Sequence, residues 1–207
     1  MGRQKKVAAY NTMQRNLSAS YEVSGLELNL LGLPFVEADR LPPTLDQLFD
    51  KYPLGVIVLW ITSPRGVSPQ GGHWTFILRT APRSLLYFDS YGIPAGTEPT
   101  YGARPSALIN PANLKGWHVD QLAATINGCQ LQAFSPGLTG EIINTCGRYA
   151  LLVALYARQK MAAGVLPTVA GFVRDHGFSC VPGDDSRSTA SGNDARVVAL
   201  TNPILFP

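Results

Sequence analysis

The chain has 207 residues and a net charge of +3, which suits one globular domain with a core of its own. With 45% hydrophobic and 15% charged residues, the composition excludes an intrinsically disordered protein. Apolar residues never run for the roughly 18 positions that a membrane-spanning helix needs, so we expect a soluble monomer without a membrane partner.

The N-terminal segment carries few clear signals. Residues 1–25 are basic but lack the apolar run of a signal peptide, so we expect a flexible basic arm. The apolar segment 26–36 alternates too weakly to separate strand from loop. Thr44 is a candidate N-cap and Pro53 ends the pattern that follows it, which together predict a short helix over 45–51.

Three strands are predicted next. The segment 55–63, "GVIVLWITS", is a β-branched and aromatic run bounded by turn residues. The segments 73–80, "HWTFILRT", and 84–92, "SLLYFDSYG", are joined by the short turn "APR", a spacing typical of a hairpin. The simplest arrangement is a meander of these three strands, followed by a loop over 92–111.

The second half is predicted to be mainly helical. Residues 111–128 fit either a helix or a short turn, and 128–135, "GCQLQAFS", alternates like a further strand. A buried helix is expected to begin at Cys146, because the residues after it are apolar nearly all round, and to end near Gly164.

The C-terminal region is expected to finish the domain and then lose regular structure. A helix is predicted over 168–178. Residues 181–207 are rich in Pro, Gly, Ser and Asp, which predicts a loop or tail, partly disordered, after a single domain over 26–180. Strands followed by helices indicate an α+β fold.

The three cysteines, Cys129, Cys146 and Cys180, are an odd number without CxxC or Cys/His ligand spacing. This pattern argues against a disulfide framework and against a zinc site, so we expect no metal and an intracellular, reducing location.

Cys146 is the candidate nucleophile. A thiol attacks a carbonyl as the thiolate, which helix N-terminal amides and a histidinium partner both stabilise. Thr145 or Asn144 is expected to cap the helix, and Gly147 lets the chain pass close to the sulfur. Taken alone, a buried helical cysteine is more often a small apolar core residue than a nucleophile.

Three further residues complete the candidate site. His73 opens one strand and would exchange a proton with the thiol and the leaving amine, while Asp89 would orient its imidazole. Gln132 would donate to the oxyanion together with the Cys146 backbone amide, and Gln130 on the same strand face is the alternative donor. Each residue alone suits a structural role; their order favours catalysis.

The segments "GGHWTFILR", "LLYFDSYGIP", "CQLQ" and "NTCGRYALL" resemble the adenain (adenovirus protease) family. Its relatives include cysteine proteases of other large DNA viruses and the proteases that remove ubiquitin-like modifiers. The match runs over about 55–157, with Asp89 where adenain has Glu. The resemblance implies a papain-like or adenain-like cysteine protease domain over 26–180, in which a central mixed β-sheet packs on helices and the nucleophile lies at the N-terminus of a buried central helix.

The resemblance also implies substrate-binding roles. Trp74 would wall the site beside His73, although packing in the core is an equal alternative, and Gly147 would border the substrate. Gln132 precedes Cys146 by 14 residues, further than in the relatives, which implies an insertion over 136–144.

The function implied is a viral maturation endopeptidase that cleaves capsid or scaffold precursor proteins through a thioester acyl-enzyme. Alternatives are a deconjugase of ubiquitin-like modifiers or an effector acyltransferase of the same fold, and a catalytically inactive binding module. The chain would act in the nucleus or cytoplasm of a host cell, or be packaged in the virion.

No cofactor is required for the chemistry, but the resemblance implies an activating peptide or DNA as candidate activators. A disulfide from Cys180 to such a peptide is one interpretation, and a structural thiol is the other. The basic residues Arg3, Lys5 and Lys6 support only weak nucleic-acid binding.

Overall fold

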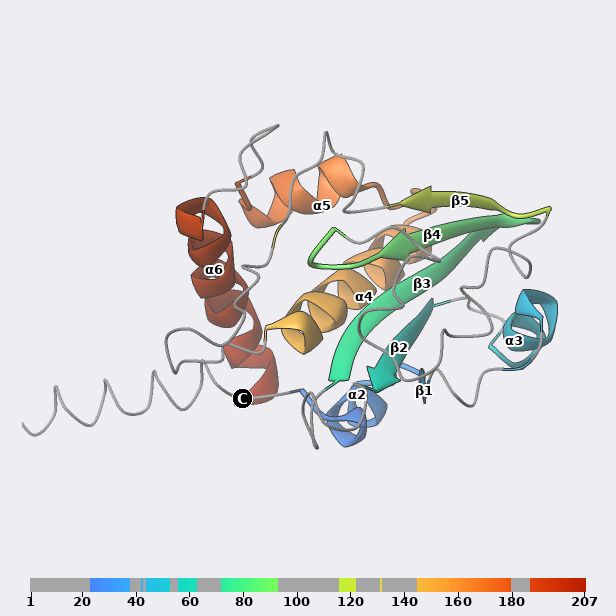
Figure 1. The fold of residues 1–207 in the computed structure, drawn as a ribbon, viewed down its shortest axis with the longest axis horizontal. Coiled ribbons are helices and arrows are strands. Elements are labelled where there is room, and N and C mark those ends of the chain that lie inside the picture. The colour runs from blue at the N-terminus through green and yellow to red at the C-terminus, as the bar shows by residue number, and fades with distance from the viewer. Residues whose placement is uncertain are drawn as a thin grey trace, which may run out of the picture.

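The computed structural model of the chain describes residues 23–37, 42, 44–52, 56–62, 72–92, 116–121, 131, 145–179 and 187–207. Within them, helices and strands form an α+β fold with one mixed sheet, as the sequence predicted (Figure 1). No helix among the described residues is long and apolar enough to span a bilayer.

Among the described residues, the sheet has five strands in sequence order, with parallel pairs at both edges and antiparallel pairs in the middle. The predicted meander of the three central strands is therefore confirmed. Within the range 111–128, for which the sequence left helix or turn open, residues 118–121 form a strand that pairs with the strand at 84–88, and residues 111–115 and 122–128 lie outside the described part of the chain. The strands are β1 (Phe35–Glu37), β2 (Val56–Thr62), β3 (Gly72–Ala81), β4 (Ser84–Phe88) and β5 (His118–Gln121).

The central helix is α4 (Cys146–Ala162), which packs across β3 and β2 (Figure 1). Its first turns are buried on every side, as the apolar run predicted. The helix ends where predicted, because Gly164 adopts a left-handed φ of 70° that favours glycine.

Two threonines begin short helices in the expected way. Thr44 accepts a hydrogen bond from the Gln47 amide at the start of α3 (Leu45–Lys51). Thr168 does the same for the Gly171 amide in α5 (Val169–His176). Both predicted helices are confirmed, and both N-caps have extended backbone dihedrals.

The predicted flexible arm reaches too far. Ser24 and Glu27 form a reciprocal capping box at the start of α2 (Gly25–Leu30), and Val23 is buried in the core. Residues 23–25 therefore belong to the folded body, because local capping and burial compensate for the polar composition. Residues 1–22 lie outside the described part of the chain.

The expectation of a loop or tail over 181–207 is wrong for most of its length. Residues 187–205 form α6 (Arg187–Leu205), which packs beside α4 (Figure 1). Its polar composition misleads because other segments satisfy its buried polar groups. Asn193 bonds both backbone groups of Ser179, while Asp194 and Thr201 bond side chains of α4.

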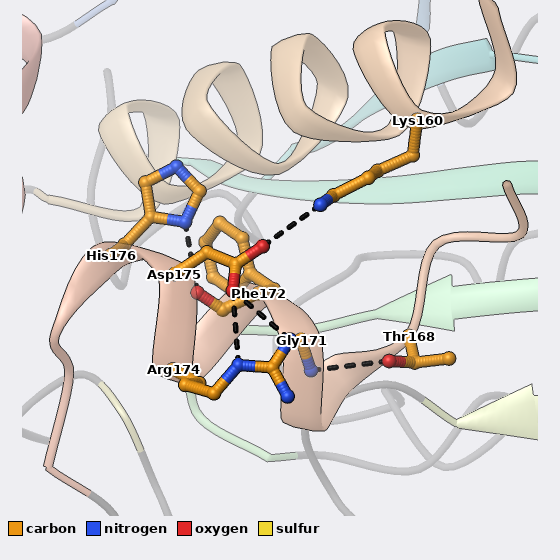
Figure 2. Close-up of polar contacts among 7 residues, drawn as sticks. All are labelled: Lys160, Thr168, Gly171, Phe172, Arg174, Asp175 and His176. Atoms are coloured by element: carbon orange, nitrogen blue, oxygen red, sulfur yellow. Dashed lines mark hydrogen bonds and ion pairs between the residues drawn. The ribbon is translucent and has the colours of Figure 1, made fainter. Parts of the chain in front are cut away.

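Helix α5 is attached to α4 mainly by apolar packing, with polar contacts at its surface. Figure 2 shows Lys160 of α4 reaching to Asp175 of α5, where Nζ and Oδ2 are 2.9 Å apart. His176 Nδ1 bonds the Phe172 carbonyl within α5 at 2.8 Å, and its ring packs against Phe172 and Tyr156. His176 is thus used in helix packing, apart from the candidate site.

Candidate active site

His73 and Asp89 meet across the β3–β4 hairpin, as the sequence predicted. His73 is the second residue of β3, and Asp89 directly follows β4. His73 Nε2 lies 2.8 Å from Asp89 Oδ2, and both side chains are almost entirely buried. The antiparallel pairing of Phe76 with Phe88 sets the register that brings them together.

Asp89 is held by further groups from the same hairpin. The Tyr91 amide donates to Asp89 Oδ1 at 2.8 Å, and the Tyr87 hydroxyl lies 3.5 Å from Oδ2. The Tyr91 ring also stacks on the His73 imidazole, with ring centroids 4.8 Å apart. Sequence reasoning missed this role for Tyr91, although its place two residues after the acid in "DSYG" was an available signal.

Cys146 is the first residue of α4 and is buried with a free thiol. Its side chain lies close enough to the His73 imidazole to help raise the pKa of that ring, through hydrogen bonding and charge. The fold therefore brings His73, Asp89 and Cys146 together from three separate parts of the chain.

The electrostatics of this chain favour a charged imidazole. Burial lowers the pKa of His73, but the charge of Asp89 and hydrogen bonds to Asp89 and Cys146 outweigh it and raise the pKa to about 10. His73 is consequently an imidazolium at neutral pH. An imidazolium next to a thiol is the arrangement that stabilises a thiolate and can later release a proton to a leaving group.

The start of α4 differs from the expected capping. Thr145 occupies the N-cap position, but its side chain accepts no hydrogen bond from the helix. Its hydroxyl instead donates to Asp194 Oδ1 on α6 at 2.7 Å. The prediction that Thr145 caps the helix is therefore wrong, because a residue 49 positions away takes its hydroxyl. Asn144, the other candidate cap, lies outside the described residues.

Trp74 and Gly147 form a tight contact beside the nucleophile. Trp74 is buried and meets Phe35 edge-on, with ring centroids 5.9 Å apart. A Cβ added at Gly147 would lie 2.9 Å from Trp74 Cδ1 and 3.0 Å from Val23 Cβ. This burial favours the core-packing interpretation of Trp74, and contact of either residue with substrate stays a prediction.

We expect Gly147→Ala to destabilise the fold by about 1–3 kcal/mol, the usual cost of overpacking. The new methyl group would come too close to Trp74 and Val23. Either these side chains or the helix turn that carries Cys146 must therefore shift. Chemical denaturation measures the loss. Gly192→Ala on α6 is the control, since nothing lies within 4 Å of its added Cβ. Equal stability of the two variants would contradict the close packing.

Gln132 and its alternative Gln130 lie outside the described residues, as do Cys129 and Cys180. The neighbouring Leu131 is described and buried, and its carbonyl accepts a hydrogen bond from the Tyr149 hydroxyl on α4 at 3.1 Å. This contact attaches the chain next to Gln132 to the helix of the nucleophile. The assignment of the oxyanion donor stays a prediction.

In the described part of the chain, no group of three or more His, Cys, Asp or Glu side chains could hold a metal ion. Comparison with known proteins adds no assignment. No protein-family model, no curated protein and no solved structure matches this chain.

Proposed function

We propose that this chain is a cysteine peptidase of papain-like, adenain-like fold that uses Cys146, His73 and Asp89. The observation that carries the proposal is the buried Asp89–His73 pair, with Asp89 Oδ2 2.8 Å from His73 Nε2, beside a thiol at the first residue of a buried helix. The Cys146 side chain is close enough to contribute to the raised pKa of His73, which a histidine held only for packing would not need.

The proposed chemistry follows from these positions. The Cys146 thiolate attacks the peptide carbonyl, and a C–S bond forms as the carbonyl oxygen becomes an oxyanion. His73 then gives its proton to the amine nitrogen as the C–N bond breaks, which leaves a thioester. Neutral His73 next removes a proton from water, and the hydroxide displaces Cys146 and releases the acid. Asp89 keeps the imidazole oriented throughout.

Backbone amides at the start of α4 supply the electrostatic part of the proposal. The N-terminal end of a helix carries partial positive charge, which favours both the thiolate and an oxyanion beside it. Gln132 is the proposed side-chain donor to the same oxyanion. No metal or organic cofactor is needed for these steps, and an activating peptide or DNA remains part of the proposal from the resemblance.

The proposed substrates are capsid or scaffold precursor proteins of a virus, since the motifs around His73, Asp89 and Cys146 resemble adenain. A deconjugase of ubiquitin-like modifiers, an acyltransferase and an inactive binding module are the competing outcomes. No contact among the described residues favours one of these three over the proposal.

The test is labelling of the folded protein with two vinyl sulfone probes, one on a short peptide and one on the tail of a ubiquitin-like modifier. We expect the peptide probe to modify Cys146, located by mass spectrometry against Cys129 and Cys180. His73→Gln should slow the labelling because the imidazolium is lost. Labelling by the modifier probe alone would replace the proposal with a deconjugase, and absence of any labelling at Cys146 would sink both.

A further inference from the structure

Thr145 behaves unlike the other threonines that begin helices in this structure. Thr44 and Thr168 accept hydrogen bonds from helix amides, at 3.3 and 3.1 Å. The Thr145 hydroxyl donates to Asp194 Oδ1, and its backbone has φ −90° and ψ −6°, away from the extended conformation of the other two. The helix that carries the candidate nucleophile is thus the one whose threonine does not cap it.

Asp194 is built into the structure in a way that holds this hydroxyl firmly. It lies on α6, is 4% exposed, and a buried carboxylate is costly unless its oxygens accept hydrogen bonds. Tyr149, one turn into α4, lies near the same carboxylate, and its hydroxyl donates to the Leu131 carbonyl at 3.1 Å. Burial, and then the charge of the nearby Asp194, raise the pKa of Tyr149 well above its usual range, so the phenol stays neutral.

A second set of contacts joins the same turn of α4 to α6. Arg148 is fully buried, and its Nη1 donates to Thr201 Oγ1 at 2.7 Å and to Asn202 Oδ1 at 2.9 Å. These bonds fix the first turn of α4 against α6 independently of Asp194. The turn therefore has a second anchor on α6, besides the Thr145–Asp194 bond.

We propose that Asp194 is a positioning residue for Cys146, which draws the Thr145 hydroxyl away from the start of α4, so that no side-chain cap takes an amide of the turn that carries the sulfur. The inference rests on the proposed cysteine chemistry. Thr44 and Thr168 accept from the third amide of their helices, and a capping Thr145 would likewise accept from the Arg148 amide and weaken the field of the first turn at the sulfur.

The competing interpretation is that the Thr145–Asp194 bond merely joins two helices. The interpretations differ in what happens when both partners are removed. If the bond is only an attachment, Asp194→Ala and Thr145→Ala should each do similar harm, and the double variant should be no better. If Asp194 restrains a competing hydroxyl, removing that hydroxyl should repair the Asp194→Ala variant.

The experiment measures the rate at which iodoacetamide alkylates Cys146 at neutral pH, followed on the Cys146 peptide by mass spectrometry. Asp194→Asn is the reference variant, because the amide oxygen still accepts from Thr145 while the charge is removed. We expect Asp194→Ala to react about 2- to 5-fold more slowly than Asp194→Asn, the usual range for loss of a helix-terminus interaction. Adding Thr145→Ala should restore the rate of Asp194→Asn.

Equal rates for Asp194→Ala and Asp194→Asn would overturn the inference, and so would a double variant as slow as Asp194→Ala. Asn193→Ala is the control for general damage, since it removes a buried side chain of α6 that bonds Ser179 and does not contact α4 in any hydrogen bond described above. Should Asp194→Ala fail to fold, Asp194→Ser replaces it, because serine is too short to reach Thr145.

Alkylation needs no substrate, so this result is separate from the proposed function. The predicted order of rates together with loss of peptide cleavage in Cys146→Ala supports both statements. The predicted order with cleavage intact in Cys146→Ala retains the role of Asp194 at the sulfur and removes the peptidase assignment. If the rates do not follow the predicted order but Cys146→Ala loses peptide cleavage, the peptidase assignment stands and only the role of Asp194 is removed.

Discussion

Cys146→Ala is expected to lower the rate of precursor cleavage at least about 10⁴-fold, as is usual when a covalent nucleophile is removed. The alanine has no atom that can form the thioester, so no activated nucleophile remains beside His73. Cleavage is measured by electrophoresis of capsid or scaffold precursors incubated with equal amounts of each variant. Cleavage by Cys146→Ala at the wild-type rate would remove Cys146 from the mechanism.

The fold should survive this substitution. Cys146 lies in the core cluster with 6% exposure, and alanine removes only one heavy atom from it. Val197→Ala on α6 is a suitable control, because it also truncates a buried side chain but lies outside the hydrogen-bonded site. We expect Val197→Ala to reduce thermal stability at least as much as Cys146→Ala while cleavage stays near the wild-type rate.

Asp89→Asn is expected to lower kcat by roughly 10²- to 10⁴-fold, the usual contribution of a positioned proton-transfer group. The amide keeps the shape of the carboxylate, and its oxygen can still accept from the Tyr91 backbone. It no longer stabilises the imidazolium, and it favours the wrong tautomer of the neutral ring.

The same substitution should move the pH dependence in a defined direction. In the wild type, Asp89 raises the pKa of His73 to about 10 against the effect of burial, so the acid needed for the leaving amine persists to alkaline pH. Without the carboxylate, burial dominates and the pKa of His73 falls. The alkaline limb of kcat/KM should therefore shift to lower pH.

Tyr87→Phe is the matched control for Asp89→Asn. It removes a hydroxyl 3.5 Å from the same carboxylate oxygen and leaves the charge in place. We expect a small change in kcat and an alkaline limb close to that of the wild type. An Asp89→Asn profile that coincides with that of Tyr87→Phe would show that the charge of Asp89 does not control His73.

Local signals in the sequence were sufficient for the elements that carry the site. A β-branched and aromatic run located β2, and the short turn between two apolar segments located the β3–β4 hairpin that brings His73 near Asp89. Thr44 located the start of α3, while the change from polar to apolar residues located the start of α4 at Cys146. Each signal comes from residues close in sequence, which is why it can be read without a structure.

Long-range contacts decided what these local rules could not. Residues 187–205 have the composition of a loop, yet they form α6. Val197 packs in the core with Leu200 and Ile204 against it, while Thr145 and Arg148 at the start of α4 bond polar side chains of α6. Trp74 fits either a site wall or a core, and the contact with Gly147 and Phe35 favours the core. Tyr91 stacks on His73 and bonds Asp89 because the β3–β4 hairpin brings these residues together.

Residue types and their order thus determine that an imidazole, a carboxylate and a thiol are available on neighbouring strands and at a helix start. Tertiary structure alone decides the hydrogen bonds of Thr145, because its choice between capping α4 and bonding Asp194 depends on a helix 49 residues away. Local sequence cannot predict which of the two bonds Thr145 makes. The Asp194 carboxylate is buried, and needs a hydrogen-bond donor, only once α6 has packed against α4.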